Sequence, residues 1–211
     1  MNPPIKNCKI CFKEIQNDDT SHLFNKDLCL CASCQNEFDP LFIDFKIDGY
    51  KATSLYEYTP FIRKLIYQYK GCFDYELFMT FLASFTRELK WRYHGYYVIP
   101  APSYSKDDER RGFNHVIEVF KQIGLKIYPI IEKVAHHKQA ESNAKKRKKI
   151  GKYLKLKDSP DLSDKKVLIV DDIYTTGSTI RNMIYFIEKL NPKAIKVLVL
   201  AKTRPKTKRK N

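Results

Sequence analysis

The sequence has no run of about 18 apolar residues, the length that a helix needs to cross a bilayer. Residues 1–10 are polar and include a cysteine, so they lack the apolar centre of a secretory signal peptide. No internal repeat is present, which argues against a repeat architecture. These absences predict a cytoplasmic protein without membrane insertion, either free in the cytoplasm or peripheral at the inner face of the membrane.

Cysteine occurs six times without any sign of export. In a reducing compartment such thiols bind metal or stay free. Four of them form two Cys-x-x-Cys pairs within residues 1–40, and each pair bends the chain so that two thiolates can take one side of a tetrahedral zinc ion. Cys29 is an alternative ligand to Cys31, while Cys72 is expected to be a buried apolar residue. The predicted structural zinc ligands are Cys8, Cys11, Cys31 and Cys34.

The chain has a formal net charge of +15, and two of its segments contain almost no acidic residues. Residues 133–157 contain ten basic residues and one acid, Glu141, and residues 202–210 contain six basic residues and no acid. These two segments account for the whole positive excess, because the rest of the chain is balanced. They favour a polyanion or a phosphate-rich ligand, whereas a solubilising loop and a disordered tail are the alternative interpretation.

Helix and strand patterns alternate in the second half of the chain. Short apolar runs predict buried strands, and apolar residues that recur every three to four positions predict helices. Strands that alternate with helices favour right-handed crossovers and a parallel sheet, so the predicted fold class is α/β. The predicted strands are 96–100, 167–170 and 194–200, with a strand or strand pair in 126–134, and the predicted helices lie at 116–123 and 179–190.

The first half is expected to lead into that sheet. Residues 41–58 are rich in Phe and Tyr and are interpreted as an extended connection. Thr59 is placed to cap a helix that begins with Pro60 and ends at Gly71. Residues 78–89 repeat apolar side chains at helical spacing and predict a second helix. Further on, the basic segment that ends at Lys157 lacks a wide apolar face and is expected to be a mobile loop.

The most specific pattern is the run from residue 167 to residue 179. A buried strand ends in two adjacent acids, Asp171 and Asp172, and a loop rich in hydroxyl side chains leads into a helix. Ligands bind at the carboxyl ends of parallel strands, and the start of a helix offers unpaired N–H groups to a phosphate. Gly177 lets the backbone close around that phosphate, and the two carboxylates suit the hydroxyls of a ribose. Helix capping would explain Thr179 alone, and the missing Gly-Lys-Ser/Thr ending excludes a Walker loop.

This run resembles the signature for phosphoribosyl pyrophosphate (PRPP) in type I phosphoribosyltransferases. In that family the two acids hold the ribose 2′- and 3′-hydroxyls, the following loop holds the 5′-phosphate, and Mg²⁺ accompanies PRPP. The resemblance therefore implies catalytic and PRPP-binding roles for Asp171 and Asp172. The loop residues implied to bind PRPP are Thr175, Thr176, Gly177, Ser178 and Thr179.

A second run narrows the resemblance to the ComF/GntX branch of that family. Residues 98–114 contain a Pro-x-Pro strand end and an Arg-Gly-Phe-Asn sequence before a helix, and Gln139 and Arg147 follow in the basic segment. An arginine beside a glycine at a helix start can hold an anion. Beside the PRPP signature, Arg111 and Gly112 are therefore the expected pyrophosphate site.

The resemblance extends to the aromatic lead-in at 55–58 and to the Lys-Gly pair at 70–71. Three positions depart from the pattern of the branch. Arg110 stands where an acid is common, His115 where a glutamine is common, and Ile150 where an asparagine is expected. These departures put shared chemistry of the basic loop in doubt, and His115 is interpreted as a residue of the helix surface.

The ComF branch implies a role in natural competence, in which incoming single-stranded DNA is handled in the cytoplasm ahead of recombination, with other competence or recombination proteins as partners. The basic segments agree, because clustered Lys and Arg neutralise phosphates. The alternative is a phosphoribosyltransferase that acts on an unidentified acceptor and has no nucleic-acid role, and the sequence leaves open whether turnover occurs. The expected DNA contacts are Lys145, Lys146, Arg147, Lys148, Lys149, Lys206, Lys208, Arg209 and Lys210.

The predicted architecture is thus a type I phosphoribosyltransferase-like parallel sheet flanked by helices, with a small N-terminal zinc-binding module. The expected divisions of the chain are 1–40 for the zinc module, 41–95 for an aromatic and helical lead-in, 96–203 for the phosphoribosyltransferase-like domain and 204–211 for a basic tail.

Overall fold

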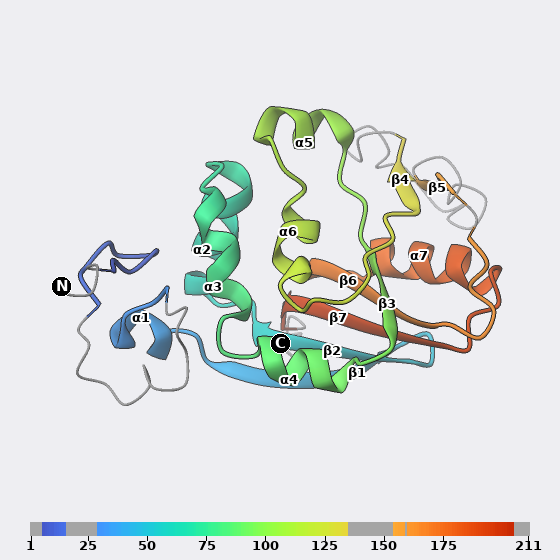
Figure 1. The fold of residues 1–211 in the computed structure, drawn as a ribbon, viewed down its shortest axis with the longest axis horizontal. Helices are drawn as coiled ribbons and strands as arrows, with labels where there is room; N and C mark the ends of the chain where they lie inside the picture. Colours follow the sequence, from blue (N-terminus) through green and yellow to red (C-terminus); the bar gives the residue numbers. More distant parts are fainter. Residues whose placement is uncertain (1–5, 16–28, 135–153, 159, 205–211) are drawn as a thin grey trace, which may run out of the picture.

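A five-stranded sheet forms the centre of the protein (Figure 1). The structure is a computed structural model and describes residues 6–15, 29–134, 154–158 and 160–204. The strand order is β1-β2-β7-β6-β3, in which β1 is antiparallel to β2 and all other neighbours are parallel. The predicted α/β class with a mostly parallel sheet is confirmed. The strands are β1 (Pro40–Ile47), β2 (Tyr50–Glu57), β3 (Tyr96–Pro100), β6 (Lys166–Tyr174) and β7 (Ala194–Lys202).

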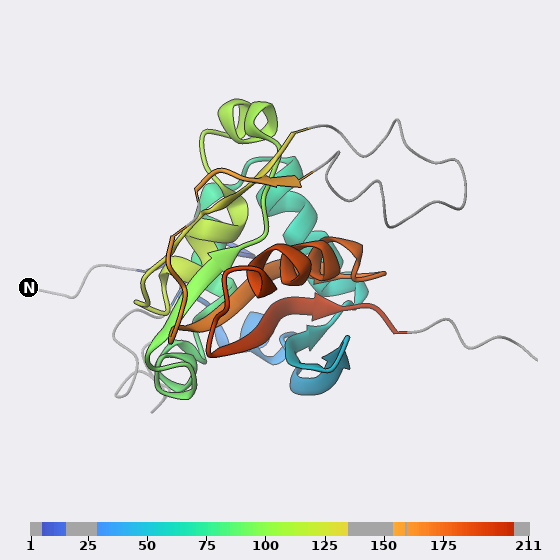
Figure 2. The ribbon, with the colours of Figure 1, turned by 90° about the vertical axis from the view of Figure 1, so that its right-hand side faces the viewer.

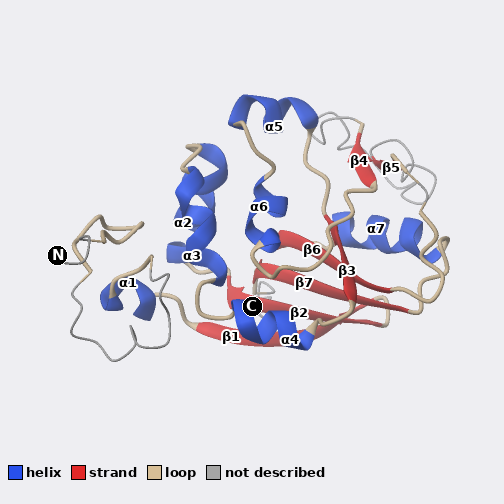
Figure 3. Cartoon of the chain, in the orientation of Figure 1, coloured by secondary structure: helices blue, strands red, loops and turns tan. Residues whose placement is uncertain are grey.

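Helices cover both faces of the sheet (Figures 1 and 3). Side chains alternate along β6, so Leu168 and Val170 enter one apolar core while Val167 and Ile169 enter the other. The first core includes residues of α2, α3, α4 and α6, and the second core includes residues of α7. The helices are α2 (Pro60–Gly71), α3 (Phe78–Leu82), α4 (Thr86–Arg92), α6 (His115–Lys121) and α7 (Ser178–Glu188), with a 3₁₀ turn at Tyr75–Leu77.

Helix α2 begins and ends where the sequence predicts. The Thr59 hydroxyl accepts a hydrogen bond from the Ile62 N–H at 3.3 Å, and Pro60 occupies the first turn, where its missing N–H costs nothing. One stripe of the helix is buried against the first core, which leaves Lys70 in the last turn free to face the sheet end. The buried stripe consists of Ile62, Leu65, Ile66 and Tyr69.

The interpretation of residues 41–58 as a connection is wrong, because they form β1 and β2. Strand β2 lies inside the sheet between β1 and β7, paired with β7 from Lys51 to Glu57. Its centre contains two buried hydroxyl residues, which hide the apolar pattern of a strand. Thr53 donates to Asp44 at 2.7 Å, and Ser54 donates to the Tyr56 carbonyl at 2.8 Å. Strands from both sides of residue 95 share this sheet, and the division of the chain into domains stays a proposal.

The single helix predicted over 78–89 is also wrong, because α3 and α4 are separated by a bend. Phe85 has φ −124°, outside helical geometry, and its ring packs against Phe42 at 5.1 Å and Tyr56 at 6.1 Å. The apolar spacing continues across the bend, so a helical period cannot reveal it.

Two further segments form a helix and a strand that the sequence analysis does not predict. The polar residues before Arg111 form α5 (Ser105–Arg111), which has no buried residue and therefore no apolar stripe to predict it. Strand β4 (Ile131–Lys133) lies in the segment predicted as a strand or strand pair, and it pairs with β5 (Leu154–Leu156), so the end of the basic segment is a strand. Figure 2 shows this small sheet above the central one. The rest of the predicted mobile loop, residues 135–153, lies outside the described residues.

The N-terminal module packs on the same core as α2. Cys8, Leu30 and Phe38 are buried in the first core, and Lys9 forms an ion pair of 2.5 Å with Glu76. A short helix, α1 (Ala32–Asn36), completes the module. Among the described residues, no helix has the length and apolar character to span a bilayer.

Candidate functional site

Four cysteine sulfurs of the N-terminal module converge on one point. The Sγ atoms of Cys8, Cys11, Cys31 and Cys34 all lie within 4.8 Å of one another, and those of Cys11 and Cys31 are 3.6 Å apart. Burial raises the pKa of Cys8, but hydrogen bonds from nearby backbone N–H groups outweigh burial and lower the pKa to about 7. A thiolate is the form that binds metal, and four such ligands are compatible with a closed tetrahedral zinc site.

The two other cysteines stand apart from this cluster. Cys29 is buried and its Sγ contacts the Met79 carbonyl at 3.7 Å, so the four-sulfur group contains Cys31 and leaves Cys29 out. Cys72 is exposed after the end of α2, so the expectation that it is buried is wrong.

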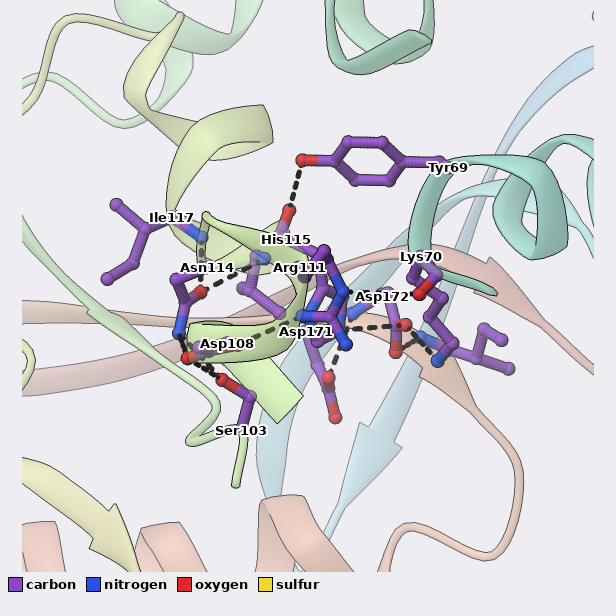
Figure 4. A network of polar contacts seen from close by, with 12 residues as sticks. Tyr69, Lys70, Ser103, Asp108, Arg111, Asn114, His115, Ile117, Asp171 and Asp172 are labelled. Carbon is purple, nitrogen blue, oxygen red and sulfur yellow. Dashed lines mark hydrogen bonds and ion pairs between the residues drawn. The ribbon is translucent and has the colours of Figure 1, made fainter. Parts of the chain in front are cut away.

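Asp172 is the meeting point of three secondary-structure elements (Figure 4). Lys70 Nζ, from the last turn of α2, lies 2.6 Å from Asp172 Oδ2. His115 Nε2, at the start of α6, lies 3.2 Å from the same oxygen. The His115 and Asp172 side chains are only 12% and 13% exposed. The interpretation of His115 as a surface residue is wrong, and Lys70 is a site residue that helix and strand patterns missed, although the Lys-Gly pair that ends α2 pointed to it.

The pKa values of the two neighbouring acids are shifted in opposite directions. Burial raises the pKa of Asp172, but the charge of Lys70 and the hydrogen bond from His115 outweigh it and hold the pKa well below its ordinary value. Burial and the negative charge of Asp172 raise the pKa of Asp171 well above its ordinary value. Asp172 is therefore held as a carboxylate, whereas Asp171 is harder to ionise beside it.

Strand β6 places these acids on opposite faces. The strand was predicted to stop before Asp171, but it continues to Tyr174, and Asp171 pairs with Val199 of β7. Because side chains alternate along a strand, Asp172 faces α2 and α6 while Asp171 faces the other side. The apolar pattern that predicts a strand ends at Asp171, the first charged residue, although backbone pairing with β7 continues to Tyr174.

Arg111 is turned into the protein. Its Nη1 lies 2.9 Å from Asp108 Oδ1 and 3.1 Å from His115 Nδ1, and its Nε donates to the Lys70 carbonyl at 3.1 Å. The Arg111 side chain is 8% exposed. A guanidinium only donates, so His115 Nδ1 accepts and the proton of a neutral imidazole lies on Nε2, toward Asp172. Arg111 thus orients His115 and the end of α2.

Asn114 joins α6 to the loop that follows β3. Its Oδ1 accepts from the N–H groups of Val116 and Ile117, at 3.1 and 3.0 Å, and so caps α6. Its Nδ2 donates to Ser103 Oγ and to Asp108 Oδ2, both at 2.8 Å. The Arg-Gly-Phe-Asn sequence therefore holds a polar network in place, with Gly112 at φ +81° ending α5.

The loop between β6 and α7 has an open helix start. Gly177 precedes α7 with φ +72°, and an added Cβ would lie 2.5 Å from the Tyr174 ring, so only glycine fits. No side chain caps the 11-residue helix α7. Its first N–H groups and the surrounding hydroxyls can therefore receive an anion. The exposed hydroxyl residues at this end are Thr175, Thr176, Ser178 and Thr179.

Arg181 adds a cation beside this loop, and the sequence analysis missed it. Its Nη1 donates to the Thr176 carbonyl at 2.6 Å, and its Nε lies 3.3 Å from Asp48 Oδ1. The residue is on the first turn of α7, where a helical period would place it near the loop.

Comparisons with known proteins found a matching domain and a curated relative. The model of the phosphoribosyl transferase domain matches residues 109–211. Competence protein ComFC of Streptococcus pneumoniae is 25% identical and covers 85% of this chain and 90% of its own length. The chain therefore has a ComF-like homologue and contains a phosphoribosyltransferase domain. The sequence-based assignment to that family, with a cysteine cluster near the N-terminus, is confirmed.

Solved phosphoribosyltransferases were also found. A hypoxanthine phosphoribosyltransferase from Staphylococcus aureus is 13% identical with a TM-score of 0.38, and covers 62% of this chain and 74% of that chain. A purine phosphoribosyltransferase from Pyrococcus horikoshii is 22% identical with a TM-score of 0.36, and covers 59% and 73%.

We predict about one tightly bound zinc ion per chain, because the cluster offers four sulfur ligands. Cys31→Ser should lose the metal and unfold the N-terminal module, since metal binding and folding are coupled in such modules. Serine retains the ability to cap α1, where the Cys31 sulfur accepts from the Cys34 N–H, so the loss reports the metal. Metal analysis of reduced protein purified without chelators measures this. Cys29→Ser and Cys72→Ser are controls that should keep zinc, and a wild-type chain without zinc would contradict the prediction.

We predict that Lys70→Met raises the pKa of Asp172, because the nearest cation is removed. A depressed carboxyl pKa contributes stability above the unfolded pKa of about 4 and loses it as the pH falls. The variant should therefore be less stable than wild type at neutral pH, and the difference should shrink below pH 4 or so. Carboxyl carbon NMR titration and denaturant unfolding at several pH values measure both effects. Lys64→Met, on an exposed position of the same helix, should change neither.

Proposed function

We propose that this chain is a competence-associated protein that binds PRPP at the end of β6 and handles single-stranded DNA in the cytoplasm. The observation that carries the proposal is the adjacent pair Asp171–Asp172 followed by an exposed hydroxyl loop and the uncapped start of α7. Carboxylates accept from ribose hydroxyls, and the helix start suits a phosphate, so one phosphoribosyl group spans both features.

The acids divide the ribose contacts between them. Asp172 is already held by Lys70 and His115, so it offers a charged acceptor in a fixed position. Asp171 has a raised pKa, and a cation that accompanies the ligand would favour its ionised form. Mg²⁺ bound to PRPP oxygens fits beside such a carboxylate, because Mg²⁺ prefers oxygen ligands and few protein groups.

The phosphate contacts come from the loop and from α7. The N–H groups that open α7 and the hydroxyls of Thr175, Thr176, Ser178 and Thr179 point to a 5′-phosphate site, and Gly177 allows its close approach. Arg181 would add positive charge. For Arg111 we propose a positioning role, because its guanidinium is engaged by Asp108, Lys70 and His115 rather than open to pyrophosphate.

The nucleic-acid part of the proposal rests on the basic segments and on the name of the S. pneumoniae relative, which is a competence protein. The contacts predicted at 145–149 and 206–210 lie outside the described residues. The structural zinc ion is proposed to hold the cysteine module against the core that carries α2. Other competence or recombination proteins remain proposed partners.

A true phosphoribosyltransferase is the second candidate, favoured by the match of the domain model to residues 109–211. A PRPP-dependent release of pyrophosphate, assayed with and without candidate acceptors and single-stranded DNA, separates it from a protein that binds PRPP as a ligand only. Release that requires an acceptor and is lost in Asp172→Asn would support catalysis.

We predict that Asp171→Asn and Asp172→Asn each weaken PRPP binding by about 1.5–3 kcal/mol, the worth of a hydrogen bond to a charged acceptor. This corresponds to roughly 10- to 150-fold in the dissociation constant. Calorimetric titration of Mg²⁺–PRPP into the full chain measures the effect. Asp39→Asn, at an exposed position before β1, is the matched control and should leave the affinity unchanged. Unchanged affinity in the double variant would place the PRPP site elsewhere.

We predict that the full chain binds single-stranded DNA with little sequence preference and a strong dependence on salt. With about four to eight phosphates neutralised, log affinity should fall with log salt at a slope of roughly −3 to −6. Fluorescence anisotropy of a labelled oligonucleotide across a salt series measures it. Deleting residues 204–211 should flatten the slope without changing the affinity for PRPP. An absence of binding at low salt would remove the nucleic-acid role.

A further inference from the structure

A second basic surface lies at the amino ends of the parallel strands, opposite to the end that carries Asp172. Lys46 of β1 pairs directly with Lys51 of β2, and Lys51 pairs directly with Lys196 of β7. Paired residues have their side chains on one face, so three lysine side chains share one face in a row across three strands. Like charges in such positions destabilise a sheet, and a bound anion would relieve their repulsion.

The row has no acidic counterpart in the described part of the chain. No carboxylate there lies within ion-pair distance of Lys46, Lys51 or Lys196. The one acid nearby, Asp44, already accepts from the Thr53 hydroxyl at 2.7 Å and lies 3.8 Å from Arg92 Nη2. The excess charge of this surface is therefore open to a ligand.

The lysine row lines a hollow of about 470 Å³. Four basic side chains and a single acid surround it, together with the buried ring of Tyr93. Lys196 Nζ lies 5.8 Å from the centre of that ring and 5.1 Å from the centre of the Tyr96 ring, and these contacts hold one cation of the lining in place. The basic lining residues are Lys46, Lys51, Arg92 and Lys196.

The helix that contributes Arg92 to the hollow also carries an exposed aromatic ring. Trp91 is the only tryptophan of the chain, and it directly precedes Arg92 on α4. Its side chain is 82% exposed, more than any other large apolar residue that the structure describes as exposed. An unpaired nucleobase stacks on such a ring, whereas the bases of a duplex are stacked on one another and are not available.

From these observations we infer that the hollow binds phosphates of a single-stranded nucleic acid and that Trp91 stacks against its bases. The inference rests on the proposed handling of single-stranded DNA, and it adds a contact surface that neither basic segment contains. The row lies roughly 13 Å along β7 from the level of Asp172, four residues at about 3.3 Å each, so a strand could occupy it beside an occupied PRPP site.

Trp91 supplies its own test in the full-length chain. An unlabelled thymidine oligonucleotide should quench Trp91 fluorescence over the same concentrations at which a labelled one changes anisotropy. The double variant Lys51→Gln/Lys196→Gln should flatten the slope of log affinity against log salt by about 1.4, since each lost phosphate contact accounts for about 0.7. The melting temperature of this double variant should stay constant or rise, because repulsion between the lysines is relieved. Replacing residues that are needed only for the fold would lower the melting temperature.

Lys13→Gln/Lys106→Gln is the matched control, because it removes the same charge at exposed positions in the N-terminal module and on α5, which lie away from α4 (Figure 1). It should leave the slope unchanged. If the anisotropy showed binding but Trp91 fluorescence was not quenched and the double variant kept the wild-type salt slope, this inference would be overturned. The proposed function would remain intact. No anisotropy change at all would overturn both. If inorganic pyrophosphate quenched Trp91 equally and oligonucleotide length had no effect, the ligand of the hollow would be a small anion and not a nucleic-acid strand. That result would also overturn the inference.

Discussion

The ion pair between Lys70 and Asp172 is the contact on which the rest of the site depends. It joins α2, from the first half of the chain, to β6, from the second half, and Arg111 holds the carbonyl of the same lysine. Lys70 precedes the matched region 109–211, so a carboxylate of that region is paired with a residue outside it. Because the cysteine module packs on the core that carries α2, one apolar core joins this module, α2 and the strand that carries Asp172.

Two adjacent acids acquire different properties from one strand geometry. Alternation along β6 turns Asp172 toward two donors and Asp171 away from them. Burial raises the pKa of both carboxyls, but only at Asp172 do the neighbouring donors outweigh burial and lower the pKa. Arg111 of the neighbouring Arg-Gly sequence maintains this difference between the two acids, because its buried side chain orients His115, which contacts Asp172. The site is thus organised before any ligand arrives, which lowers the entropy that binding has to offset.

Local patterns predicted the elements that have a clear period or a distinctive composition. The cap at Thr59, the strands at Tyr96 and Ala194, and the four-cysteine cluster follow from spacing and side-chain type. What could not be predicted depends on tertiary contacts. Strand β2 hides its pattern behind buried hydroxyls, the bend at Phe85 leaves the helical period unbroken, and the contact of His115 with Asp172 joins residues 57 positions apart. The lysine row is likewise invisible until the strand order is known.

The most direct test of the central claim is a titration of Mg²⁺–PRPP into ¹⁵N-labelled full-length protein, followed by backbone amide NMR. Binding at the end of β6 predicts saturable shifts in the amides of Asp171, Asp172 and the loop from Thr175 to Thr179, together with Lys70 at the end of α2. Shifts confined to other parts of the chain, or none at ligand concentrations well above those of a specific complex, would contradict it.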